Sequence, residues 1–275
     1  MKKKIMLYFL IFLSVCCGVM WSILGSEQSK SEKELNIAIL DSGINSSEMN
    51  VTHHDVVESQ ISSDEYGHGT GVFHVLKKHM EELGIWDGTS IHSVKVMDKK
   101  GNVTKDAFIE GMEYAMIQDV DLINISFGFN HDDPNVREAI DRATKKGVLI
   151  VAAAGNNFGM QSDYPARYEN VVSVNAYDTS KNRVPRYAAK GKVDFVAPGE
   201  GIFTRNQFDE KIKVSGSSFA TPYITATAAA YLVHANRVIQ GPKQIIGDLS
   251  EYASLTEEMN EKEEYVGAGI PLLDK

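Results

Sequence analysis

The sequence predicts an α/β fold, a doubly wound and mainly parallel sheet with helices on both faces. Short apolar runs rich in β-branched residues alternate along the chain with longer segments of helical spacing. Such alternation is typical of parallel strands joined by crossover helices. Since 43% of the 275 residues are apolar, a sizeable core is available.

Six runs are predicted to be buried strands because they are short, apolar and bounded by turn residues. They are residues 35–40, 91–97, 120–127, 148–154, 171–176 and 193–197. Four further segments are predicted to be helices. They are residues 71–83, 104–118, 134–146 and the Ala/Thr-rich run 223–234. Pro134 suits a first helical turn and Gly147 a helix end.

The N-terminus carries an uncharged apolar run from Ile5 to Leu24, directly after three lysines. A run of about 20 apolar residues is long enough to span a bilayer, and the basic start favours leaving the rest of the chain outside. Residues 1–25 are therefore a signal-anchor or a cleaved signal peptide. A lipoprotein site at Cys16 or Cys17 is a weaker alternative.

The rest of the chain divides into a polar tether and one globular domain. The tether covers residues 26–34 and the domain residues 35–275. No cysteine follows residue 17, which excludes a disulfide framework from the domain. The formal net charge of −9 argues against nucleic acid as a partner. We expect a protein of the bacterial cell envelope, membrane-anchored with this domain outside, or secreted if the N-terminal segment is cleaved.

An aspartate, a histidine and a serine lie in three separate glycine-containing motifs. Asp41 lies in DSG, His68 in YGHGT and Ser218 in SGSSFATP. A serine hydroxyl becomes a good nucleophile when a histidine takes its proton and a carboxylate orients that histidine. The chain order Asp, His, Ser is the order of the subtilisin triad. Ser217 is the rival nucleophile within the third motif.

These motifs resemble those of the subtilisin-like serine proteases, the subtilases of peptidase family S8, over about residues 35–240. The resemblance implies Ser218 as nucleophile, His68 as base and Asp41 as the orienting carboxylate. The segment AAAGN implies that Asn156 donates its amide to the oxyanion. Phe219 stands where the family usually has methionine.

The resemblance also implies a substrate bound as an extended strand. The segments that would line the substrate are Ser126, Phe127 and Gly128 on one side, Gly101, Asn102 and Val103 on the other, and Ala154 with Gly155. Phe108 and Phe127 are either the lining of an apolar subsite four residues before the scissile bond or ordinary core residues.

Asp163 is the main clue to specificity. It precedes the Tyr164–Pro165 pair, which the resemblance predicts to be cis, and it would lie at the base of the pocket for the P1 side chain. A carboxylate there predicts Lys or Arg at P1, because an apolar side chain would leave the charge without a partner. The alternative is that Asp163 faces solvent.

No cofactor and no metal are expected. His53, His54 and Asp55 match no strong ligand spacing. The segment 71–83 continues without the interruption that forms the family's main calcium loop. Fewer than 20 residues separate the apolar run from Asp41, so we expect no pro-domain.

The leading functional hypothesis is a serine endopeptidase that acts on peptides or proteins outside the cell. One version processes a secreted peptide precursor, and the small size and basic-P1 clue resemble the leader peptidases of lantibiotic clusters. The alternatives are a general extracytoplasmic protease and a catalytically silent domain that binds peptides.

Overall fold

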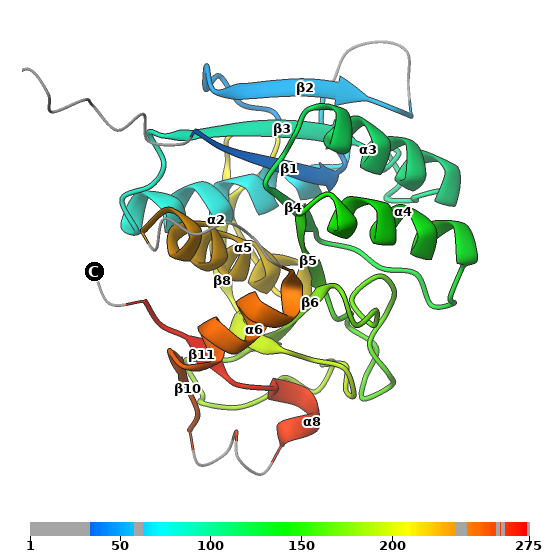
Figure 1. The fold of residues 1–275 in the computed structure, drawn as a ribbon. Helices are drawn as coiled ribbons and strands as arrows, with labels where there is room; N and C mark the ends of the chain where they lie inside the picture. Colours follow the sequence, from blue (N-terminus) through cyan, green and yellow to red (C-terminus); the bar gives the residue numbers. More distant parts are fainter. Residues whose placement is uncertain (1–33, 58–62, 235–240, 257–258, 260–261, 274–275) are drawn as a thin grey trace, which may run out of the picture. The chain divides into compact units, whose positions relative to one another are not determined.

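Seven parallel strands form the central sheet of the computed structural model, which describes residues 34–57, 63–234, 241–256, 259 and 262–273 (Figure 1). In spatial order the strands are β2 (Val51–Asp55), β3 (Thr89–Lys95), β1 (Leu35–Asp41), β4 (Leu122–Ile125), β5 (Leu149–Ala153), β6 (Val172–Tyr177) and β7 (Phe195–Pro198). Every neighbouring pair is parallel. The predicted fold class is confirmed, and each of the six predicted strands is present with its ends shifted by at most two residues.

Helices cover both faces of this sheet. One face carries α2 (His68–Glu82), α5 (Ser217–His234) and α6 (Pro242–Ser250), and the other carries α3 (Lys105–Ile117) and α4 (Pro134–Lys145) (Figure 1). Alternate residues of a strand point to opposite faces. In β1, Ile37 and Ile39 therefore join the core beneath α2 and α5, whereas Ala38 and Leu40 join the core beneath α3 and α4.

The helix ends follow the local sequence. The side chain of Thr104 accepts a hydrogen bond from the Ala107 amide at the start of α3, and Asp133 accepts one from the Asn135 amide at the start of α4. These are ordinary N-cap contacts, which satisfy amides that have no partner within the helix. Pro134 occupies the first turn of α4, as predicted.

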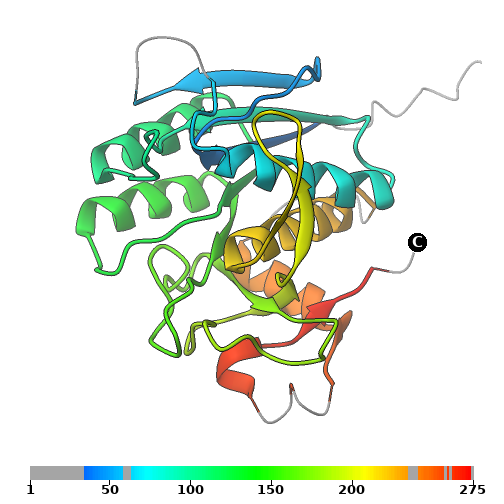
Figure 2. The ribbon, with the colours of Figure 1, turned by 180° about the vertical axis from the view of Figure 1, so that it is seen from behind.

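Several elements were not predicted. The edge strand β2 pairs only with β3, and its sequence VTHHD contains no apolar run. It therefore lacks the pattern by which the other strands were predicted. A hairpin of β8 (Ile202–Arg205) and β9 (Lys211–Val214) lies against α2, where Thr204 Oγ1 donates to the Gly71 carbonyl at 2.7 Å (Figure 2). The remaining ones are α6, the pair β10 (Ala253–Ser254) and β11 (Ile270–Pro271), and the short helix α8 (Glu263–Val266).

The N-terminal apolar run and most of the tether lie outside the described residues. The predicted anchor or signal peptide at 1–25 therefore stays a prediction, as do the domain boundaries. Among the helices that the structure does describe, none has the length and apolar character needed to cross a bilayer.

Candidate active site

Three of the predicted site residues lie at the carboxyl edge of adjacent strands. Asp41 ends β1, Ser126 follows β4 and Asn156 follows β5, and these strands are neighbours in the order β1, β4, β5. The carboxyl edge of a parallel sheet is where ligands bind in open α/β folds. The fold thus gathers residues that lie more than a hundred positions apart in the sequence.

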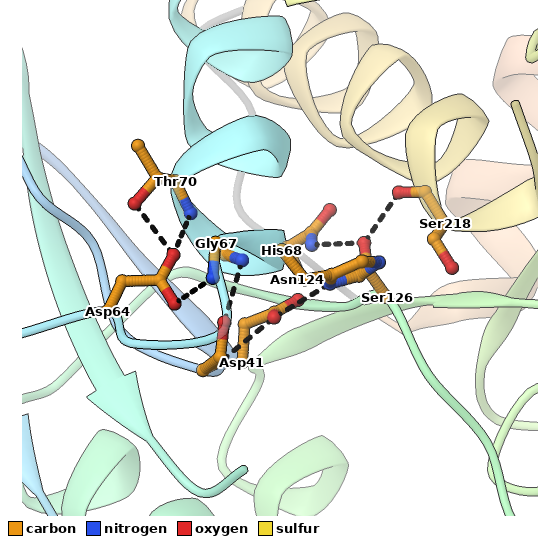
Figure 3. A network of polar contacts seen from close by, with 10 residues as sticks. Asp41, Asp64, Gly67, His68, Thr70, Asn124, Ser126 and Ser218 are labelled. Atoms are coloured by element: carbon orange, nitrogen blue, oxygen red, sulfur yellow. Dashed lines mark hydrogen bonds and ion pairs between the residues drawn. The ribbon is translucent and has the colours of Figure 1, made fainter. Parts of the chain in front are cut away.

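His68 and Asp41 form a direct hydrogen bond. His68 Nδ1 lies 2.8 Å from Asp41 Oδ1, and the Asp41 carboxylate is buried with only 1% of its surface exposed (Figure 3). The Ser42 amide donates to the same oxygen at 2.8 Å. Because Nδ1 faces the carboxylate, Nε2 is the ring nitrogen left to take a proton from a nucleophile.

Gly69 makes this close approach possible. A methyl group on Gly69 would lie 2.2 Å from the Gly43 carbonyl oxygen and 3.1 Å from Asp41 Cβ. The Gly69 amide instead donates to Ser42 Oγ at 2.9 Å. The glycine after the histidine therefore lets the first turn of α2 contact the end of β1.

The environment of His68 favours its protonated form. Burial of the imidazole lowers its pKa, but the negative charge of Asp41, the hydrogen bond with Asp41 and the charge of Asp64 together raise it above the ordinary value. Such a ring is suited to accept a proton and to hold the resulting charge.

Ser218 is the second residue of α5, and Figure 3 shows it at the start of this helix. The ring of the following residue, Phe219, packs 5.3 Å from the His68 ring. In the described part of the chain, Ser218 Oγ makes no hydrogen bond. Such catalytic contacts often tighten only when substrate binds.

The rival serine is engaged elsewhere. Ser217 is fully buried, and its Oγ accepts a hydrogen bond from the Gly155 amide at 3.2 Å. Ser218 is half-buried, and its Oγ makes no hydrogen bond to another described residue. Of the two candidates, Ser218 is the one whose hydroxyl is available to a substrate.

Asn156 lies next to the nucleophile segment with a defined orientation. Its Oδ1 accepts a hydrogen bond from the Ser217 amide at 2.9 Å. Its Nδ2 makes no hydrogen bond to any described residue and would lie 3.0 Å from a methyl group on Gly216. The carbonyl side of the amide is thus fixed, and the N–H₂ side is left to donate to a bound group.

Asp163 lies between the ends of β4 and β5. Phe129 and Tyr164 exchange backbone hydrogen bonds of 2.6 and 2.9 Å, and the Asp163 amide donates to the Ala154 carbonyl at 2.8 Å. A methyl group on Gly128 would lie 2.6 Å from Asp163 Cβ. The two predicted walls, 126–128 and 154–155, therefore meet at Asp163. The Tyr164–Pro165 bond is cis, as predicted.

The Asp163 carboxylate is half-buried and has no ion-pair partner among the described residues. Asn157 Nδ2 approaches it at 3.5 Å, and the Arg167 guanidinium stacks over Tyr164. Burial raises the pKa of the Asp163 carboxyl above its ordinary value, against the opposing effects of Asn157 and Arg167. A cation bound beside this carboxylate would reverse that shift.

The opposite segment, Gly101–Val103, lies at the end of a turn. Val103 pairs with Met97 in an antiparallel bridge. A methyl group on Gly101 would lie 2.7 Å from Tyr66 Cζ, and the Tyr66 ring lies 6.3 Å from the His68 ring. Tyr66, which the sequence analysis did not single out, therefore spans the gap between the histidine and this segment.

The two phenylalanines have different surroundings. Phe108 is fully buried and packs edge-on against Phe127 and Phe129 at ring distances of 6.1 and 5.6 Å. Phe127 is half-buried. Of the two interpretations left open, the core one holds for Phe108, and only Phe127 reaches the surface.

Two further charged residues support the turn before His68, and the sequence analysis missed both. Asp64 binds backbone amides of this turn, and Lys95 is buried with its Nζ 3.2 Å from the Ser63 carbonyl. Lys95 Nζ also lies 3.7 Å from carboxylate oxygens of Asp55 and Glu65. An acidic residue just before a helix is a capping signal that could have indicated Asp64.

Within the described ranges, no group of three metal-ligating side chains occurs. His54 stacks on the ring of Tyr114 at 3.7 Å. That contact gives one residue of the HHD run a packing role.

The comparisons with known proteins agree with this geometry. The model of the Subtilase family matches residues 32–245. Subtilisin DY of Bacillus licheniformis is 30% identical over 72% of this chain and 76% of its own length. Subtilisin Savinase of Lederbergia lenta is also 30% identical, over 71% and 75%.

Solved structures show the same fold. A cold-adapted subtilisin-like serine proteinase is 25% identical, with a TM-score of 0.76 over 88% of this chain and 90% of that one. The prenylagaramide maturation protease PagA, at 21% identity and a TM-score of 0.73 over 89% and 93%, is a likeness of fold alone. The chain belongs to the subtilase family, the subtilisin-type serine proteases.

Proposed function

We propose that this protein is a serine endopeptidase in which Ser218 attacks the peptide carbonyl and His68 takes its proton. Asp41 holds the imidazole through Nδ1 and stabilises its charge. The Asn156 amide and the Ser218 backbone N–H donate to the oxyanion. The single observation that carries this proposal is the 2.8 Å hydrogen bond between His68 and a buried carboxylate, directly beside the start of α5.

We infer that the enzyme prefers Arg or Lys at P1. The supporting observation is the Asp163 carboxylate, half-buried and without an ion-pair partner in the described chain, between the segments 126–128 and 154–155. A guanidinium or ammonium group would neutralise this charge with charge-assisted hydrogen bonds.

We infer that the substrate is a secreted peptide precursor, cleaved outside the cell by an enzyme that is anchored to the membrane or secreted. The likeness of fold to a maturation protease supports this inference. A general extracytoplasmic protease is the second candidate. It would accept many P1 residues, so the width of the P1 preference separates the two.

The test uses the full chain and its Ser218→Ala variant on matched peptides that differ only in Arg or Leu at P1. We expect hydrolysis of the Arg peptide, lost in the variant. Equal activity in both chains rejects the proposed nucleophile, and a preference for Leu rejects the proposed role of Asp163. A folded chain that binds both peptides and hydrolyses neither would be a silent peptide-binding domain.

A further inference from the structure

Asp64 is a buried carboxylate at the start of α2, outside the triad. It is 1% exposed. Its oxygens accept hydrogen bonds from the Gly67 amide at 2.6 Å, the Thr70 amide at 2.8 Å and Thr70 Oγ1 at 2.7 Å (Figure 3). Its own amide donates to Asn45 Oδ1 at 2.8 Å. These contacts fix the turn on which His68 stands.

The position of His68 makes this carboxylate electrostatically important. His68 is the first residue of α2. A helix N-terminus carries a partial positive charge of about half an elementary charge, which opposes the formation of an imidazolium there. Asp64 accepts two of the amides at this end and places a full negative charge beside them. Since the site is buried, the interaction is weakly screened.

The other charged groups around His68 are its partner Asp41 and groups that are exposed or already paired. From β1 comes Asp41, its direct partner. On the segment before α2, Glu65 is 41% exposed and lies 3.7 Å from Nζ of Lys95. Lys95 is a buried cation from β3, and its Nζ also lies 3.7 Å from an Asp55 carboxylate oxygen, so its positive charge is paired on both sides. The hairpin places the neutral Gln207 against Gly67.

The remaining elements add little net charge. On the hairpin, Arg205 and Asp209 pair with one another at 2.9 Å. From α5, the ring of Phe219 packs against the imidazole and carries no charge. Asp64 is therefore the second buried negative charge that acts on the imidazole.

We propose that Asp64 is a positioning residue of the proteolytic reaction, which holds the first turn of α2 and offsets the positive end of this helix beside His68. The proposal rests on the proposed role of His68 as the general base. In this arrangement Asp41 orients the ring, and Asp64 allows a helix N-terminus to carry a base that must become positively charged.

The pKa of His68 supports this division of roles. Burial lowers it, and the charges of Asp41 and Asp64 raise it. Removing the charge of Asp64 while keeping its shape should therefore lower the pKa of His68.

The decisive experiment compares Asp64→Asn with Glu65→Gln, a matched loss of one negative charge at the neighbouring, exposed position. The imidazole of His68 is titrated by NMR in a Ser218→Ala background, and the pH profile of kcat/KM is measured in chains that retain Ser218. We expect Asp64→Asn to lower the pKa of His68, and the acid limb of the profile, by about one unit. It should also reduce kcat by about tenfold or more, because an asparagine side chain has one acceptor oxygen where Asp64 uses two to hold this turn. Glu65→Gln should leave both values nearly unchanged.

An unchanged or raised His68 pKa in folded Asp64→Asn overturns the proposal, whatever happens to the rate. If that variant does not fold, Thr70→Val replaces it. This change keeps the charge of Asp64 but removes a hydroxyl donor from it, so the pKa of His68 should rise, and no rise overturns the proposal. Because the NMR titration needs no turnover, it separates a failure of Asp64 from a failure of the proposed peptidase activity.

Discussion

The carboxylate of Asp163 occupies the space into which a side chain on Gly155 would project. A methyl group there would lie 2.2 Å from Asp163 Oδ2, and Gly155 has a φ of 104°. Gly155 directly precedes Asn156, so the proposed oxyanion segment and the proposed P1 determinant are in van der Waals contact. A substitution in one of these two segments should therefore alter the geometry of the other.

The first prediction concerns the charge of Asp163. Asp163→Asn should lower kcat/KM for an Arg-P1 peptide by about 10- to 100-fold, since a charge-assisted hydrogen bond contributes roughly 1.5–3 kcal/mol. The value for a Leu-P1 peptide should stay the same or rise. Steady-state kinetics on the peptide pair measure this, with Asp106→Asn, an exposed carboxylate on α3, as control. Equal losses on both peptides would contradict a role in P1 recognition.

The second prediction concerns the contact itself. Gly155→Ala should destabilise the fold by more than Gly84→Ala, because both glycines have positive φ but a methyl group on Gly84 meets nothing within 4 Å. Gly84→Ala, the control, should lower the free energy of unfolding by about 1 kcal/mol from backbone strain alone. Urea unfolding of the two variants, in a Ser218→Ala background that prevents self-digestion, gives the comparison. Equal losses of unfolding free energy in the two variants would mean that the Asp163 side chain moves aside at no energetic cost.

The third prediction separates two adjacent asparagines. Asn156→Ala should reduce kcat by about 10²–10³-fold with little change in KM, the magnitude known for removing such a donor in subtilisin. Asn157→Ala should leave kcat almost intact but raise KM for Arg-P1 peptides, because the Asn157 side chain approaches Asp163 and the Gln161 carbonyl. A kcat loss of similar size in both variants would show that kcat depends on the conformation of this loop and not on the Asn156 amide itself.

The fourth prediction follows from the raised pKa of His68. As a base the imidazole must be neutral, so kcat/KM should fall as the pH drops through a value above about 6.5. The contribution of His68 to stability changes with pH in the opposite direction to its effect on kcat/KM. Protonation of His68 stabilises the fold fully below the unfolded pKa, and this contribution is lost as the pH rises through the folded pKa.

The stability arm is measured in Ser218→Ala with and without His68→Gln. The difference in free energy of unfolding between these chains should be larger at pH 5 than at pH 9 by about 1.4 kcal/mol for each unit of pKa shift. A difference that does not depend on pH would contradict a raised pKa.

The sequence alone determined the class of fold and the order of the site residues. Buried strands and amphipathic helices produce a recognisable pattern of apolar residues in the sequence, because each residue's burial depends on its place within one element. Asp41, Ser126 and Asn156 were located correctly at the strand ends for this reason. The edge strand β2 was missed because a strand paired on one side leaves only a weak pattern.

Tertiary structure decided what periodicity does not encode. Whether Ser217 or Ser218 has a free hydroxyl depends on the Gly155 amide, 62 residues away in the chain. The burial of Phe108 depends on its packing against Phe127 and Phe129, and the environment of His68 depends on the capping of α2 by Asp64. Sequence patterns record which residues are buried, whereas hydrogen bonds and charges act between particular atoms that only the packed chain brings together.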